Sequence, residues 1–214
     1  MIIGIIHATC NAVPPLNDAF IDKDNEVTVL NFVDESIQFY ANKVNKIDDK
    51  IYRSFVNLAL TAQDAGVDAI VIACTVLTPI IDYIRPLIKV PVTAVDYPML
   101  EYAMQTYEKI GVVVTTAPSG PATKSQLEAL AQKNNKNIKI KVETSTKAMD
   151  ELKRGNVERH NELNRIVASN LKSDGCEVII LAQVTQAIAK SKVETIGLPV
   201  LTSPETIAES LLTT

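Results

Sequence analysis

The stretches that decide the fold are "DAIVIACTVLTP", residues 68–79, and its near-repeat "CEVIILAQVTQA", residues 176–187. In both, a short apolar run rich in β-branched residues is bounded by polar residues, which is typical of a strand buried on both faces. Cys74 directly follows the first run, and Gln183 holds the corresponding place after the second. The sequence therefore predicts two equivalent strands that end in chemically different residues.

Similar apolar runs recur along the whole chain and alternate with helical patterns. "DKIYRSFVNLALTAQDAG" and "VERHNELNRIVASNLKSDG" place apolar residues three and four apart and end in glycine. Buried strands with intervening helices indicate parallel strands covered on both faces, so we predict an α/β, doubly wound fold. The expected strands are 2–6, 27–32, 69–73, 91–95, 110–115, 138–142, 177–182 and 199–202.

A repeat of about half the 214-residue chain organises these elements. Matching positions lie 107, 109 and 108 residues apart: Gly4 and Gly111, Ala73 and Ala182, Pro91 and Pro199. We therefore expect two pseudo-symmetric Rossmann-like lobes, each a four-stranded parallel sheet flanked by helices. The predicted lobes are 1–97 and 98–204, with the last helix, 205–214, packing back on the first lobe.

The composition excludes several classes of protein. Hydrophobic residues at 47% and charged residues at 21% are ordinary for a soluble globular chain. A net charge of −4 without a basic stripe argues against nucleic acid as a partner, and no apolar run approaches the ~20 residues of a membrane span. Three cysteines without a charged, signal-like start predict reduced thiols and a cytoplasmic location. Two histidines and no CxxC predict no metal site.

Ligands of open parallel sheets bind outside the carboxyl ends of the strands. With two lobes, we expect the site in a cleft between them, where Cys74 and Gln183 face each other. The segments at these strand ends are "HATCN", "VDES", "CTV" and "VDYP" in the first half, and "TTAPS", "ETST", "QVT" and "TSPE" in the second.

Several of these segments carry a family resemblance. "ACTVL" is similar to the first-lobe "CNT" motif of the aspartate/glutamate racemase superfamily, and "LAQVT" lies where its second-lobe "GCT" motif belongs. "VDES", "VDYPM", "ERHN" and "LPVLTSPE" resemble a less characterised, racemase-like branch of that superfamily, which also includes hydantoin racemases, maleate isomerases and arylmalonate decarboxylases. The resemblance covers nearly the full length. It implies two lobes, a small carboxylate substrate, no cofactor and a homo-oligomer.

The departure from the family pattern narrows the chemistry. In the two-base members, one cysteine removes a proton beside a carboxylate and the other returns a proton to the opposite face. Gln183 does not ionise, so we expect it to orient a substrate carboxylate or carbonyl, or to stabilise an enediolate. Three classes stay open: a racemase or isomerase, a lyase such as a decarboxylase, and a non-catalytic carboxylate-binding relative.

Cys74 and His7 are the predicted catalytic residues. Amides of a helix beginning directly after Cys74 would lower the pKa of its thiol. The alternative is a small buried apolar side chain. His7 is expected to relay a proton or to donate a hydrogen bond to Cys74, or instead to satisfy loop carbonyls.

The predicted substrate-binding residues lie at strand ends or at helix starts. Hydroxyls and exposed amides before a helix suit a carboxylate, although capping explains them equally well. Tyr52 and His160 occupy matching places 108 residues apart, with a core aromatic and a solvated helix face as the alternatives. The full set is Thr75, Val76, Thr115, Thr116, Ser119, Gln183, Val184, Thr185, Tyr52, His160 and Asn11.

Two cysteines and two carboxylates complete the candidates. Cys176 precedes a strand and is expected to be structural. Cys10 is a second thiol near the cleft or a loop cysteine without a role. Asp34 or Glu35 orients His7, or caps the segment that follows.

Overall fold

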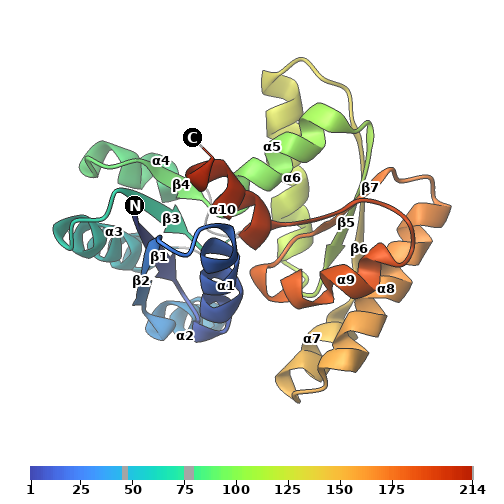
Figure 1. Cartoon of the computed structure of the whole chain (residues 1–214), viewed down its shortest axis with the longest axis horizontal. Coiled ribbons are helices and arrows are strands. Elements are labelled where there is room, and N and C mark those ends of the chain that lie inside the picture. Colours follow the sequence, from blue (N-terminus) through green and yellow to red (C-terminus); the bar gives the residue numbers. More distant parts are fainter. Residues whose placement is uncertain (45–47, 75–79, 214) are drawn as a thin grey trace. The chain divides into compact units, whose positions relative to one another are not determined.

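The computed structural model describes residues 1–44, 48–74 and 80–213. The chain divides into two compact units, Met1–Val95 together with the C-terminal residues from Leu211, and Asp96–Ser210. Each unit holds one four-stranded sheet with helices around it (Figure 1). The predicted packing of residues 205–214 on the first lobe concerns the placement of one unit against the other, and it stays a prediction.

The first unit alternates strands and helices along the chain. Its elements are β1 (Ile2–His7), the 3-10 turn η1 (Cys10–Ala12), α1 (Val13–Lys23), β2 (Thr28–Val33), α2 (Glu35–Val44), α3 (Asp49–Asp64), β3 (Ala69–Ile72), α4 (Ile81–Ile84), η3 (Arg85–Leu87) and β4 (Val92–Ala94).

The second unit repeats this alternation. Its elements are α5 (Tyr97–Thr106), β5 (Lys109–Val114), α6 (Ser119–Lys133), β6 (Lys139–Thr144), α7 (Thr146–Lys153), α8 (Val157–Ser173), β7 (Val178–Leu181), η4 (Val184–Ala189), α9 (Lys190–Glu194), β8 (Val200–Thr202) and α10 (Ser203–Leu212), whose last residues are assigned to the first unit.

The two sheets have the same topology. The strand orders are β2-β1-β3-β4 and β6-β5-β7-β8, and every pair is parallel. In the first sheet Ile6 lies opposite Phe32 and Ile72, and in the second Val113 lies opposite Glu143 and Leu181. The predicted fold class, two four-stranded parallel sheets flanked by helices, is confirmed.

Alternation of side chains buries both faces of the second sheet. Val112 and Ile180 pack against residues of α5 and α6, whereas Val113 and Ile179 pack against residues of α8 and α9. Continuous apolar strands are required because neither face of the sheet is left to solvent.

Gly4 in β1 and Gly111 in β5 each let the segment that leads from the covering helix into the neighbouring strand, β3 or β7, pass close to the sheet. A Cβ on Gly4 would lie 3.1 Å from a methyl of Val67, and a Cβ on Gly111 would lie 3.2 Å from the Cβ and Sγ of Cys176. Val67 and Cys176 each follow a glycine that ends the covering helix with positive φ. Cys176 is therefore the core counterpart of Val67 and is buried, and its predicted structural role stays a prediction.

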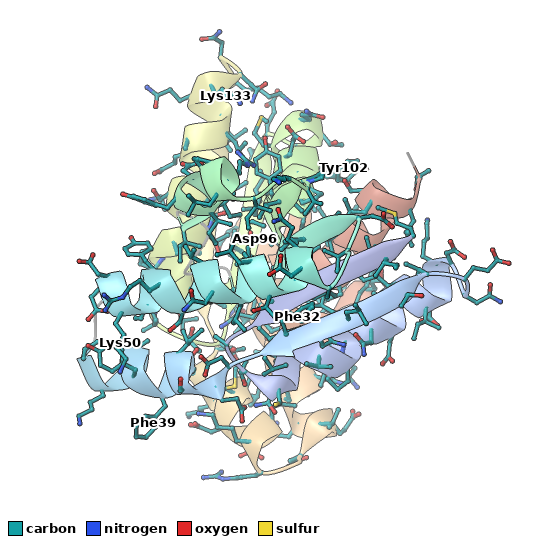
Figure 2. All side chains as sticks on the ribbon, turned by 90° about the vertical axis from the view of Figure 1, so that its left-hand side faces the viewer. Phe32, Phe39, Lys50, Asp96, Tyr102 and Lys133 are labelled. Atoms are coloured by element: carbon teal, nitrogen blue, oxygen red, sulfur yellow. The ribbon has the colours of Figure 1, made fainter. Side chains whose placement is uncertain are left out.

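The surface carries isolated apolar side chains. Phe39 projects outward from α2 and is 76% exposed (Figure 2). Among the described residues, no helix combines the length and the apolar character needed to cross a lipid bilayer.

Candidate active site

In the first unit, Cys74 and His7 lie at the same edge of the sheet. β1 ends at His7, and Cys74 follows β3 by two residues. Because Ile6 pairs with Ile72 in parallel register, the two strand ends are neighbours. Cys74 is half-buried and forms no disulfide. Thr75 and Val76 lie outside the described residues. The helix expected directly after Cys74, whose amides would lower the pKa of its thiol, falls on residues 75–79, which also lie outside them, so that effect stays a prediction.

His7 is fully buried and held by two asparagines. Its Nε2 lies 2.8 Å from Asn31 Oδ1, and the Asn31 amide nitrogen donates to Asn17 Oδ1 at 3.0 Å. Since Asn31 presents its oxygen to the ring, Nε2 carries the proton and Nδ1 is a bare acceptor. Nδ1 is buried without a hydrogen-bond partner among the described residues. Burial lowers the pKa of His7, and the bond to Asn31 opposes that shift only in part.

This arrangement changes the role that His7 can have. Neutral His7 can accept a proton through Nδ1, but it has no ring hydrogen left to donate to Cys74. The two carboxylates proposed to orient the ring bind backbone amides instead: Asp34 accepts from Ser36 at 3.0 Å, and Glu35 accepts from Cys10 at 3.1 Å. The capping alternative therefore describes Asp34, and Asn31 takes the orienting role.

Three further predicted residues of the first unit differ in their surroundings. Cys10 is exposed, and partial desolvation together with the Glu35 carboxylate raises the pKa of its thiol, which disfavours the thiolate that a second base would need. Asn11 is exposed in η1. Tyr52 lies in the first turn of α3 and packs on Tyr83, with ring centroids 5.1 Å apart.

In the second unit, Gln183 joins two strand-end turns. Its Oε1 accepts from the Thr115 backbone N–H at 2.8 Å. Its Nε2 donates to Thr116 Oγ1 at 3.1 Å and to Ser119 Oγ at 3.3 Å. Both amide hydrogens are thus used within the protein. Gln183 has no hydrogen available to donate to a substrate carboxylate, which was one of the roles predicted for it.

The hydroxyl groups at this turn have more hydrogens to donate than the described residues around them accept. Thr116 Oγ1 and Ser119 Oγ lie 2.7 Å apart, so one hydroxyl donates to the other and one hydroxyl hydrogen remains. We find no acceptor for that hydrogen within the described ranges. Thr115 Oγ1 is also buried, and no described residue hydrogen-bonds to it. The turn also begins α6, where the Ser119 N–H donates to the Thr116 carbonyl and Pro121 has no N–H. Of the first three helical positions, Gly120 therefore has the amide that can donate to an acceptor such as a carboxylate.

The other predicted residues of the second unit lie next to this turn or beneath it. Val184 is buried and Thr185 is half-buried in η4, directly after Gln183. His160 is fully buried in α8: Nδ1 lies 2.8 Å from Ala148 O, and Nε2 lies 3.2 Å from Asn164 Nδ2. Both ring nitrogens are occupied, so His160 has no nitrogen left for a substrate.

Four amides in these networks were not predicted: Asn17, Asn31, Asn164 and Gln186. The sequence did hold a signal for two of them. Asn31 interrupts the apolar run "TVLNFV", and Asn164 lies one helical turn after His160. In the described part of the chain, no three His, Cys, Asp or Glu side chains are grouped so as to hold a metal ion.

Residues 3–211 match the family model described as Asp/Glu/Hydantoin racemase. The chain belongs to this family. No curated protein matches it significantly. Membership, predicted from "ACTVL" and "LAQVT", is thereby confirmed, and it supports a racemase-like enzyme.

Solved structures with this fold share little sequence with the family member described here. An aspartate racemase homologue from Pyrococcus horikoshii has a TM-score of 0.77 at 18% identity, over 99% of this chain and 97% of that one. Glutamate racemase from Francisella tularensis, in complex with D-glutamate, has a TM-score of 0.72 at 17% identity, over 99% of this chain and 79% of that one. Allantoin racemase from Klebsiella pneumoniae has a TM-score of 0.69 at 17% identity, over 100% of this chain and 88% of that one. At such identities the likeness concerns the fold, and the substrate is a separate question.

Proposed function

We propose that this protein is a cofactor-independent racemase or isomerase that exchanges the proton on the carbon beside a carboxylate. The substrate is a small carboxylic or amino acid, and Cys74 is the acid/base group. The observation that carries the proposal is the thiol at the end of β3 in a chain of the Asp/Glu/Hydantoin racemase family. The location in the cytoplasm and the assembly into a homo-oligomer stay predictions.

The proton transfer follows from the chemistry of a thiol beside a carboxylate. The Cys74 thiolate takes the proton from the α-carbon, and the electron pair of the broken C–H bond delocalises into the carboxylate as an enediolate. The Cys74 thiol exchanges its proton with solvent and then protonates the carbon, which replaces the α-hydrogen. Inversion by this single base further requires the enediolate to turn its other face to Cys74 before the proton returns. His7 Nδ1, neutral and without a partner in the described chain, is the proposed acceptor that forms the thiolate.

The turn from Thr115 to Ser119, here called the hydroxyl turn, is the proposed carboxylate site of the second unit. Three groups are the proposed donors for oxygens that gain charge in the enediolate: the unused hydroxyl hydrogen of the Thr116–Ser119 pair, the Thr115 hydroxyl and the Gly120 N–H. The proposal requires this turn and Cys74 to contact one substrate molecule, and that placement stays a prediction.

A lyase is the second candidate, and Gln183 is the observation that favours it. Its amide does not ionise, and its hydrogens are bound to Thr116 and Ser119, so it cannot deliver a proton to the face opposite Cys74. A decarboxylation in which Cys74 protonates one face needs no second thiol.

The test is proton exchange in D₂O, followed by NMR and chiral chromatography. The substrates are both enantiomers of glutamate, aspartate and allantoin, with a 2-substituted malonate for the lyase. We expect exchange or carbon dioxide release by the wild type and a loss of about 10²–10⁴-fold in Cys74→Ser. Cys10→Ser, a thiol change at an exposed position of the same unit, should retain activity. Equal activity of Cys74→Ser and wild type would remove Cys74 as the base.

A further inference from the structure

A chain of buried polar side chains runs from α8 to the turn after β7. His160 and Asn164 lie one helical turn apart on α8, and Gln186 lies in η4; all three are fully buried. Asn164 Nδ2 lies 3.2 Å from His160 Nε2, and Gln186 Nε2 donates to Asn164 Oδ1 at 2.8 Å. Gln186 Oε1 accepts from the Gln183 backbone N–H at 3.1 Å.

Backbone groups at both ends fix the direction of every hydrogen bond. The Gln183 backbone N–H can only donate, so Gln186 presents its oxygen to it and its nitrogen to Asn164. Asn164 then presents its nitrogen to His160, and it also donates to the His160 carbonyl at 2.9 Å. At the far end the Ala148 carbonyl can only accept, so His160 Nδ1 carries the proton. His160 is thus neutral, with a bare Nε2.

No member of the chain can be reversed alone. A second proton on His160 would point at the Asn164 N–H, and flipping the Asn164 and Gln186 amides would move the clash to the Gln183 N–H, which cannot flip. Unpaired buried donors are costly, so the chain holds one arrangement. Burial lowers the pKa of His160, which agrees with a neutral ring.

We propose that His160, Asn164 and Gln186 are positioning residues for the hydroxyl turn. Their chain holds the Gln183 backbone, and the Gln183 side chain in turn holds the Thr115 amide and the Thr116 and Ser119 hydroxyls. α8 thereby supports the carboxylate site from beneath without touching the substrate. The purpose assigned to the turn rests on the proposed function, whereas the chain and its coupling to the turn do not.

The first test uses Asn164→Asp and NMR of the two imidazoles. An aspartate at this position still accepts from Gln186 and offers a second oxygen to His160 Nε2. We expect His160 to change from the Nδ1–H tautomer to an imidazolium, with a pKa raised from below to above its ordinary value of about 6.5. His7, the other histidine, should keep its titration. Asn170→Asp, the same change at an exposed position of α8, should leave His160 as in wild type.

The second test measures whether the chain reaches the hydroxyl turn. Gln186→Met keeps the length of the side chain but removes the acceptor for the Gln183 N–H, so the amide signals of Gln183 and Thr115 should both shift. Gln186→Glu keeps that acceptor and should leave the Thr115 signal near its wild-type position, which also provides a readout if the methionine variant does not fold.

Two results would overturn the proposal. One is a neutral His160 in the wild type that carries its proton on Nε2. The other is a Thr115 amide signal that does not shift in folded Gln186→Met. Both measurements are made without substrate. Absence of proton exchange would therefore count against the proposed function and leave this inference standing.

Discussion

The three cysteines differ in exposure, and single-residue chemistry should separate them. Cys176 is buried, and desolvation first, then the nearby Asp174 carboxylate, raises the pKa of its thiol. Cys74 is half-buried at a strand end. We predict that iodoacetamide labels Cys74 faster than Cys176 in the folded protein, with a pH midpoint below the ~8.5 of a free thiol. Mass spectrometry of the labelled peptides gives the rates, and equal labelling of both would contradict an activated Cys74.

His7 offers a second test at the same scale. Asn31→Asp keeps an acceptor for the Nε2–H and adds a negative charge, which favours the imidazolium, so the pKa of His7 should rise. The measurement is a ring titration by NMR. Asn11→Asp, the same change at an exposed position of that unit, should leave the titration near wild type. An unchanged pKa of His7 in Asn31→Asp would show that the ring does not contact Asn31.

At the scale of elements, sequence periodicity predicted the strands, their parallel pairing and the repeat, because burial on both faces leaves a direct trace in apolar residues. The sequence pattern identifies the hydrogen-bond partners of His7 less directly. Asp34 and Glu35 follow the predicted strand next to His7 and were therefore expected to contact its ring. Their carboxylates instead accept hydrogen bonds from backbone amides of adjacent turns. Asn31 is brought to His7 by the register of β1 against β2. The Gln183 contacts likewise join turns 67 and 64 residues apart.

Packing of elements gives a test of the repeat. Gly4→Ala should destabilise the fold by about 1–3 kcal/mol, because the new Cβ would lie 3.1 Å from a branched methyl of Val67. Gly4→Ala with Val67→Ala should cost less than the sum of the single changes, since the second substitution removes both methyls. Urea unfolding measures all three variants. Full stability of Gly4→Ala alone would contradict the close approach.

At the scale of the whole molecule, one duplicated fold has two different strand ends. The first unit presents titratable groups, Cys74 and a neutral His7. The second presents amides and hydroxyls joined by Gln183, with its histidine enclosed in α8. The unit with ionisable groups is suited to moving a proton, and the unit with fixed donors is suited to holding charge. Gln183 therefore lies in a unit whose other polar side chains also differ from those of the first unit.

Both buried histidines also tie folding to pH. Burial lowers the pKa of His7 and of His160, so between the folded and unfolded pKa values the unfolded chain binds more protons. The contribution of the histidines to stability should thus be constant above about pH 6.5 and fall as the pH decreases below it, by at most about 1.4 kcal/mol per pH unit for each histidine. The carboxylates of Glu162 and Glu177, whose pKa values are lowered by Arg165 and by backbone amides respectively, act only below about pH 4.5. Urea unfolding at pH 7.5, 6.5 and 5.5 isolates the histidine window, and equal stability at all three values would mean that neither ring is held neutral by burial.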